Sequence, residues 1–258
     1  MTHLHLTNKT VLVTGGATGI GRATAIHLAE AGARVLAAGL DEADGEALEA
    51  EQRALGRQLK FHRMDVTNDS DVRDVVLLAE RECGGLNGVV NSAAVCNTGR
   101  RLEDLSDAEW DTTFNTNVKG IFYVCRASLP ALRRAGGGSV VNIASVHALA
   151  TAVGHAAYAA SKGAVLSLSR QLALDYAVDH IRVNALIVGS VDTRMSQRAF
   201  EAAGGPESLG LSFEANVVPR IAQPKELAQV IAFLISDASS FITGTGLVAD
   251  GGVLARLM

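Results

Sequence analysis

TVLVTGGATGIG, the stretch at residues 10–21, decides the fold. Its first half is an uncharged β-rich run that predicts a strand at Thr10–Thr14, and the sequence after it predicts a helix at Ile20–Ala31. Glycines in the spacing Gly-x-x-x-Gly-x-Gly allow a tight turn, and they let backbone N–H groups reach a pyrophosphate at the helix N-terminus. A glycine-rich turn between a strand and a helix indicates a dinucleotide-binding fold.

Short β-rich runs and Ala-rich helical stretches alternate along the rest of the chain. Such alternation implies an α/β architecture, with a parallel sheet, right-handed crossovers and helices on both faces. The predicted strands are Thr10–Thr14, Arg34–Ala38, Lys60–Arg63, Leu86–Val90, Ser139–Ile143, Ile181–Ile187 and Leu247–Ala249, and the predicted helices are Ile20–Ala31, Ala43–Leu55, Asp69–Cys83, Ala108–Arg134, Ala157–Val178 and Lys225–Ile235.

Length and composition suit one large domain. The chain has 258 residues, of which 48% are hydrophobic and 19% charged, and no repeat or linker divides it. We therefore expect a single nucleotide-binding domain over residues 1–258. The stretch 192–219 contains three glycines and two prolines and reads as loop and short helix. It is interpreted as a lid over a ligand, and the alternative is an ordinary surface excursion.

Charge and cysteine content restrict the partners. The net charge of −4 gives no electrostatic reason to bind nucleic acid or an anionic membrane. The three cysteines form no Cys-x-x-Cys pair, which fits a reducing compartment, and residues 1–8 do not resemble a signal peptide, so a cytoplasmic location is predicted. Residues 135–161 lack Asp, Glu, Lys and Arg but are too polar to span a membrane, which suggests burial in a core, a site or an interface.

The run YAASK contains Tyr158 and Lys162, four residues apart. On a helix this spacing places both side chains on one face. A free phenol, with a pKa of about 10, is a poor base at neutral pH. An ammonium group at roughly 4 Å, in an effective dielectric of about 20, would favour the phenolate by about 4 kcal/mol before desolvation. The pair is thus a candidate acid/base centre, although a surface lysine above a half-buried tyrosine gives the same pattern.

Five motifs, taken together, resemble the short-chain dehydrogenase/reductase family. They are TGGATGIG, NSAA at Asn91–Ala94, Asn117 in NVKG, Ser145 in NIAS, and YAASK, and they occur in the family's order between Lys9 and Gly252. The resemblance implies a Rossmann-type, doubly wound sheet of seven mainly parallel strands and an NAD or NADP cofactor. It also implies an oxidoreductase that interconverts a secondary alcohol and a ketone or aldehyde. Ala94 and Val188 depart from the family, which often has glycine and proline there.

The resemblance also implies a role for each member of the catalytic set. Tyr158 would be the general acid and base, and Ser145 would hold the substrate oxygen. Lys162 would lower the pKa of the tyrosine and bind the nicotinamide ribose. Asn117 would position a water in a proton relay from the lysine. Two alternatives stay open: a non-catalytic dinucleotide sensor or scaffold on the same fold, and a lyase or epimerase that retains the cofactor.

The cofactor-binding residues implied by the motifs are Gly15, Thr18, Gly19, Ile20, Gly21, Gly39, Leu40, Asp65, Val66, Asn91, Ala93, Tyr158, Lys162, Gly189, Val191 and Thr193. No metal site is predicted. Gly39 aligns with the aspartate that NAD-using members carry, and neither Leu40 nor Thr18 supplies the basic residue of NADP-using members. Because no cation is expected beside a 2′-phosphate, NAD is favoured over NADP. Arg22 or Arg34 could reverse that preference.

The residues expected to line the substrate pocket are Val95, Cys96, His147, His155 and 188–191. A mainly apolar lining favours a neutral or modestly polar small molecule. For Cys96 a small buried hydrophobe is the alternative, and for the histidines a loop position without a substrate role. The compound and the reaction direction stay open. The resemblance further implies a homotetramer or dimer formed through the helices that contain Asn117 and Tyr158.

Overall fold

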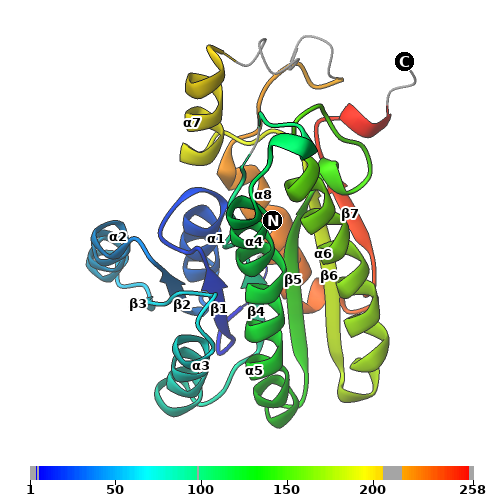
Figure 1. Ribbon diagram of the computed structural model, residues 1–258. Helices are drawn as coiled ribbons and strands as arrows, with labels where there is room; N and C mark the ends of the chain where they lie inside the picture. Colours follow the sequence, from blue (N-terminus) through cyan, green and yellow to red (C-terminus); the bar gives the residue numbers. More distant parts are fainter. Residues whose placement is uncertain (1–3, 5, 98, 206–216, 256–258) are drawn as a thin grey trace.

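The computed structural model describes residue 4 and residues 6–97, 99–205 and 217–255. Seven parallel strands form one sheet in the order β3-β2-β1-β4-β5-β6-β7 (Figure 1). They are β1 Thr10–Thr14, β2 Arg34–Gly39, β3 Leu59–Arg63, β4 Gly88–Asn91, β5 Gly138–Ser145, β6 Ile181–Val188 and β7 Gly246–Ala249. Because the order reverses between β1 and β4, the predicted doubly wound Rossmann-type fold is confirmed.

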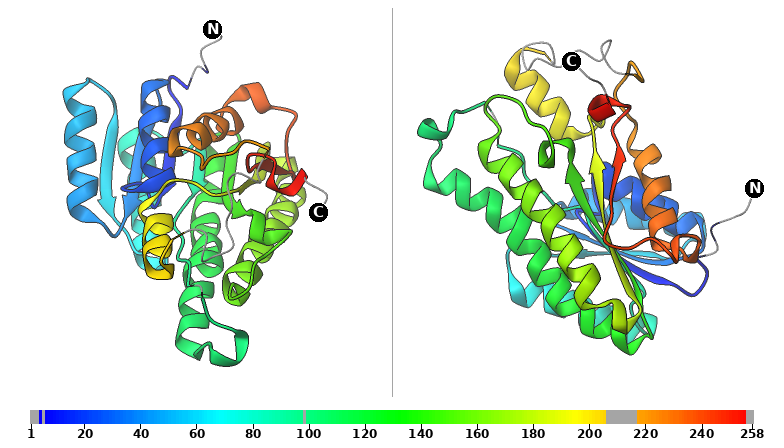
Figure 2. Two further views of the ribbon diagram at one scale, coloured as in Figure 1. Left: turned by 90° about the horizontal axis from the view of Figure 1, so that it is seen from above. Right: turned by 90° about the vertical axis from the view of Figure 1, so that its right-hand side faces the viewer.

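Eight α-helices lie in the described residues: α1 Gly19–Glu30, α2 Glu42–Ala54, α3 Asp69–Cys83, α4 Asp107–Phe114, α5 Gly120–Arg134, α6 Ala156–Asp175, α7 Arg194–Ala203 and α8 Pro224–Ile235. Helices cover both faces of the sheet, with α3, α5 and α6 on one face and α1 and α8 on the other (Figures 1 and 2). Helix α7 lies above the edge at which the strands end (Figure 1).

The uncharged strand β1 shows why the central strands read as continuous apolar runs. Leu12 packs into one hydrophobic cluster with residues of α3 and α5, whereas Val11 and Val13 pack into a second cluster with residues of α1 and α8. All three side chains are fully buried. A strand that is covered by helices on both faces has no solvent-exposed side, so its residues are apolar in both directions.

One predicted helix is interrupted. The sequence predicts a continuous helix at 108–134, but the structure has α4, a π-helical turn at Asn115–Lys119 and then α5. The wider turn carries the buried Asn117, whose side chain bonds Val95 of a neighbouring loop. Gly120 follows, where a Cβ would lie 2.9 Å from Cγ2 of Val66. Tertiary contacts therefore break the helical pattern at this point.

The other predicted helices and strands occur within about three residues of their predicted bounds. Helix α7 is the short helix expected in the stretch 192–219, and residues 206–216 of that stretch lie outside the described residues. In the part of the chain that is described, no helix combines the length and the apolar character needed to cross a bilayer.

Candidate active site

A cleft of about 820 Å³ runs along the carboxyl ends of the strands. Strand register places these ends together, since Thr14 pairs with Asn91 and Ser145 pairs with Val188. At one end the cleft is lined by the glycine-rich turn and by the end of β2, and at the other by Ser145 and helix α6. This is the edge at which open α/β sheets bind ligands.

The glycine-rich turn has the shape that a dinucleotide needs. Gly15 has φ +63°, and a Cβ on it would lie 3.0 Å from the backbone nitrogen of Ala93. A Cβ on Gly21 would lie 2.1 Å from the carbonyl oxygen of Gly15, so only glycine fits there. Thr18 makes no side-chain cap to α1, and the first turn of α1 has no acidic residue. The open N–H groups and the helix dipole therefore suit a pyrophosphate.

Most residues predicted to bind the cofactor line this cleft. They are Gly15, Thr18, Gly19, Ile20, Gly39, Leu40, Asp65, Val66, Ala93, Tyr158, Lys162, Gly189, Val191 and Thr193. Gly21 and Asn91 are not among the lining residues. Gly21 packs against the backbone of Gly15 and so allows the tight turn without lining the cleft. Asn91 is the buried last residue of β4, and its Nδ2 donates to Oδ1 of Asn142 at 2.8 Å. Asn91 thus braces β4 against β5.

Three members of the predicted catalytic set meet at the inner end of the cleft. Ser145 is the last residue of β5, and Tyr158 and Lys162 are one turn apart on α6. The Ser145 hydroxyl accepts from the backbone N–H of His147 at 3.3 Å, and its interaction with the Tyr158 hydroxyl acts to lower the pKa of that phenol. Nζ of Lys162 lies 5.6 Å from the centroid of the tyrosine ring and donates to the carbonyl oxygen of Ile143 at 2.8 Å.

Burial dominates the titration of this pair. It raises the pKa of the Tyr158 phenol, and the hydrogen bond from Ser145 opposes that rise. Burial also lowers the pKa of the Lys162 amine to about 8. A lysine in this range can be charged or neutral near physiological pH. Perturbed groups that share one cleft are typical of active sites.

Two histidines form the wall beside the tyrosine. The rings of His147 and His155 stack with their centroids 4.4 Å apart, and the edge of His147 meets the Tyr158 ring at 5.5 Å. Burial, with a smaller effect of His155, lowers the pKa of His147 to about 4, so this ring is neutral at physiological pH. Nδ1 of His155 donates to the carbonyl oxygen of Val153 at 3.0 Å. Both histidines line the cleft, as predicted for the substrate side.

The remaining substrate-side predictions also fall in the cleft. Val95 and Cys96 line it, as do residues 188–191. Burial raises the pKa of the Cys96 thiol to about 11, with Lys162 opposing, so the side chain is a neutral thiol. The structure also shows lining residues that the sequence analysis did not name, among them the apolar Val146, Met195 and Val253. Apart from the two histidines and Ser190, the substrate side of the cleft is therefore mainly apolar.

Comparison with known proteins agrees with this geometry. A family model described as enoyl-(acyl carrier protein) reductase matches residues 15–254. The chain is 38% identical over 249 residues to cyclopentanol dehydrogenase from Comamonas testosteroni, covering 96% of this chain and 98% of that protein. It is 39% identical over 251 residues to 2,5-dichloro-2,5-cyclohexadiene-1,4-diol dehydrogenase from Sphingobium indicum, covering 97% and 98%. This chain belongs to the short-chain dehydrogenase/reductase family.

A solved structure of levodione reductase is similar over 98% of this chain and 100% of its own, with a TM-score of 0.93 and 30% sequence identity. The family carries an NAD(P) dinucleotide, and the glycine-rich turn and the open N-terminus of α1 fit that group. The prediction of an oxidoreductase that acts on CH–OH groups is thereby confirmed at the level of reaction class.

Two residues of the predicted catalytic set have surroundings that the sequence does not reveal. Burial and the Cys96 thiol raise the pKa of Tyr158 and Ser145 opposes the rise, while the effect of Lys162 on the phenol stays a prediction. Asn117 does not line the cleft. Its Nδ2 donates to the carbonyl oxygen of Val95 at 2.9 Å and to Oγ of Ser161 at 3.0 Å. Both amide protons are therefore in use, and the water relay at Asn117 stays a prediction.

The sequence did not single out Arg194. This residue begins α7, lines the cleft and forms a two-point ion pair with Asp44 of α2. The only local signal is the run Thr193–Ser196, in which threonine and serine cap the helix reciprocally. That signal predicts the start of a helix but not its partner, because the ion pair joins positions 150 residues apart.

Proposed function

We propose that the protein is an NAD-dependent dehydrogenase that interconverts an uncharged secondary alcohol and the corresponding carbonyl compound. One observation carries this proposal: the hydroxyls of Ser145 and Tyr158 lie in the same cleft as the glycine-rich turn. Two adjacent hydroxyls can both hold one substrate oxygen, and one of them can exchange a proton with it.

Each polar group has a task that its chemistry allows. Tyr158 gives its proton to the carbonyl oxygen in reduction and takes it back in oxidation. Ser145 donates to the same oxygen and orients it. The bound nicotinamide supplies or accepts the hydride. Lys162, whose amine has donors beyond the one given to Ile143, binds ribose hydroxyls and, when charged, favours the phenolate.

The position of Asn117 supports a positioning role in place of direct contact. It joins the Val95 segment, which lines the cleft, to Ser161, and Ser161 donates to the carbonyl oxygen of Tyr158 at 2.7 Å. Through these bonds the turn that precedes α5 holds the start of α6 against the pocket wall. We therefore propose that Asn117 keeps Tyr158 and Val95 in register.

The lining indicates the class of substrate. Among the described residues of the substrate end there is no Asp, Glu, Arg or Lys except Lys162. The His147–His155 wall is flat, and His147 is neutral at physiological pH. A compact apolar molecule with one or two oxygens suits such a pocket, and two relatives are named for ring alcohols. We propose an alicyclic secondary alcohol or ketone.

NAD is the proposed cofactor because Arg194 and Lys162 are the only cations among the described residues that line the cleft, and Arg194 is paired with Asp44. Arg22 is paired with Glu51 at 2.5 Å. Arg34 lies at the opposite end of β2, where it donates to the carbonyl oxygen of Cys83 at 3.0 Å. Neither Arg22 nor Arg34 lines the cleft, whereas Asp41 does. A carboxylate there favours ribose hydroxyls and repels a 2′-phosphate.

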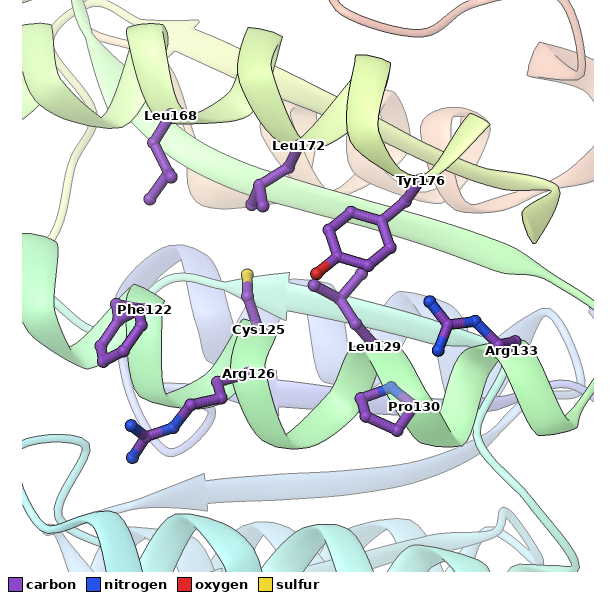
Figure 3. A pocket seen from close by; sticks show the side chains of 9 residues that line it. All are labelled: Phe122, Cys125, Arg126, Leu129, Pro130, Arg133, Leu168, Leu172 and Tyr176. Carbon is purple, nitrogen blue, oxygen red and sulfur yellow. The ribbon is translucent and has the colours of Figure 1, made fainter. Parts of the chain in front are cut away.

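The proposed assembly is a homodimer or homotetramer that uses α5 and α6. A hollow of about 200 Å³ lies between these helices on the outer face (Figure 3). It is lined by Phe122, Cys125, Arg126, Leu129, Pro130, Arg133, Leu168, Leu172 and Tyr176. Phe122 is 45% exposed, and the hollow is mostly apolar, as in the contact faces of oligomers.

Two smaller proposals accompany these. Within the stretch 192–219, helix α7 is proposed as the part that covers the cleft, because it lines the cleft through Met195 and Ala199. The three cysteines are unpaired, which supports the proposed reducing, cytoplasmic location.

The test is a panel of cyclic and open-chain secondary alcohols and ketones assayed with NAD(H) and NADP(H). A hydride-transferring dehydrogenase changes absorbance at the reduced nicotinamide band in a one-to-one ratio with the product formed. Product formation without net change at that band would point to the lyase or epimerase alternative. Nucleotide binding without product from any compound would point to a sensor or scaffold.

A further inference from the structure

Helix α7 is tied to helix α2 by one ion pair. Both Nη atoms of Arg194 bond the carboxylate of Asp44, Nη1 to Oδ2 and Nη2 to Oδ1 at 3.1 Å. Helix α2 lies beside the sheet and α7 lies above it, so the pair crosses from the lid side to the adenosine side (Figure 1). Two parallel N–H···O bonds give this contact a defined geometry.

The base of α7 holds Arg194 in place over the glycine-rich turn. Thr193 accepts from the backbone N–H of Ser196 at 3.2 Å, and Oγ of Ser196 donates to the carbonyl oxygen of Val191 at 2.6 Å. A Cβ on Gly19 would lie 3.3 Å from Cγ2 of Thr193, so the first residue of the cap sits on that turn. These contacts fix the first turn of α7 and therefore the position from which the Arg194 side chain extends.

Arg194 is also the one arginine among the described residues that line the cleft, and Lys162 is the one lysine. Lys162 lies at the nicotinamide end beside Tyr158. Arg194 lies within reach of α2, whose preceding strand ends at Gly39. A Cβ on Gly39 would lie in ordinary van der Waals contact, 3.7 Å from the Cα of Gly15, so the end of β2 is adjacent to the glycine-rich turn.

Two carboxylates, Asp44 and Asp41, lie close to the guanidinium of Arg194. The hydrogen bond from Arg194 holds the pKa of Asp44 below its ordinary value. The hydrogen bond that Arg194 donates to Asp44, followed by the charges of Asp44 and the nearby Asp41, raises the pKa of Arg194. A 2′-phosphate carries a charge of about −1.5 to −2 at neutral pH. To bind Arg194 it would have to displace one carboxylate and lie beside the other.

We propose that Asp44 sequesters Arg194 and that this pair sets the preference of the cleft for a dinucleotide with a free 2′-hydroxyl. Without Asp44, the guanidinium is released to bind a 2′-phosphate, and the protein gains affinity for NADP(H). The inference rests on the proposed function, because it assumes that a nicotinamide dinucleotide binds in this cleft. It differs from a simple charge effect, because the gain requires Arg194 itself.

The test compares dissociation constants of NADH and NADPH, measured by fluorescence titration without an alcohol or ketone. The proteins are the wild type, Asp44→Asn, Asp44→Ala, Arg194→Gln and the double variant Asp44→Asn/Arg194→Gln. The ratio of Kd for NADPH to Kd for NADH should fall on the order of tenfold in both Asp44 variants, as expected for one new charge-assisted contact. It should return to the wild-type ratio in the double variant and stay within about twofold in Arg194→Gln.

Glu49→Gln provides the matched control. It frees Arg53 from an ion pair on α2, but Arg53 does not line the cleft, so the ratio should not change. An unchanged ratio in both Asp44 variants overturns the inference, and so does a gain that survives in the double variant. The titration needs no turnover. If the wild type binds NADH but oxidises no alcohol, the proposed reaction is contradicted, but the ratio of dissociation constants still tests the role of Asp44. A wild type that binds neither nucleotide contradicts both.

Discussion

Burial disfavours the charged form of Lys162. The residue is 3% exposed, and burial brings its pKa from the ordinary 10.5 down to about 8. Its amine donates to the carbonyl oxygen of Ile143, which is a neutral group. A buried amine without an ionic partner is costly, and such a group is retained where chemistry needs it.

The sign of the resulting pH dependence follows from the depressed pKa. Between pH 8 and 10.5 the unfolded chain still holds this proton while the folded protein has released it. The free energy of unfolding therefore rises with pH across that window, by about 3 kcal/mol for this group. We predict that urea unfolding of the wild type shows this rise relative to Lys162→Met.

The exposed Lys119→Met serves as the control, and its curve should run parallel to that of the wild type. If Lys162→Met also runs parallel to the wild type over pH 8 to 10.5, the buried-amine account is wrong.

At this scale the sequence predicts positions better than it predicts electrostatics. The motifs place Ser145, Tyr158 and Lys162 together, and the structure has them in one cleft. Whether burial or a neighbouring charge controls the tyrosine depends on packing by residues distant in sequence, which no local spacing reveals. Arg194 escapes prediction for the same reason, since its partner Asp44 is remote in sequence.

At the scale of elements, the π-helical turn Asn115–Lys119 has the greatest consequence for the site. It separates α4 from α5 and directs a buried amide toward two partners, Val95 and Ser161. Turns of this kind often occur at functional sites. Here the turn connects the pocket wall to the helix that carries Tyr158.

We predict that Asn117→Ala lowers the free energy of unfolding by about 2–4 kcal/mol, because it leaves polar groups of Val95 and Ser161 without this partner. The measurement is urea denaturation followed by circular dichroism. Asn115→Ala, an exposed position on the same turn, should cost less than about 0.5 kcal/mol. Equal losses in the two variants would show that the amide bonds are not what stabilises the turn.

Sequence patterns predict the existence of most elements but not this interruption. The strand Thr10–Thr14 and the helix Asp69–Cys83 have the bounds that apolar periodicity and caps predict. The stretch 108–134 keeps a helical pattern throughout, and only contacts with Val95 and Val66 explain why it divides. Tertiary contacts override local propensity there.

At the scale of the whole molecule, the sheet order brings the two halves of the site together. The reversal between β1 and β4 opens the cleft where the glycine-rich turn lies, and β5 and α6 extend it to Tyr158. The family resemblance implies a doubly wound sheet, whereas alternation of strands and helices alone does not specify which strands are neighbours.

The proposed assembly gives a prediction at the same scale. Phe122→Glu places a charge on the α5–α6 face, and we expect sedimentation velocity to show a smaller species than for the wild type. Leu77→Glu on α3 is the control, because Leu77 is 51% exposed and lies away from that hollow, and it should leave the sedimentation coefficient unchanged. Identical profiles for all three proteins would mean that oligomers, if formed, use another face.

The account depends most on the phenol of Tyr158, and one measurement tests it directly. Stopped-flow absorbance at the reduced nicotinamide band follows a single turnover of Tyr158→Phe on an alcohol that the wild type oxidises, while titration gives the affinity for NADH. We predict a rate at least 100-fold lower, as expected for loss of general acid/base catalysis, with the Kd for NADH changed less than about threefold. A variant that binds NADH normally and keeps most of the wild-type rate would contradict the assignment of Tyr158 as the proton donor and acceptor.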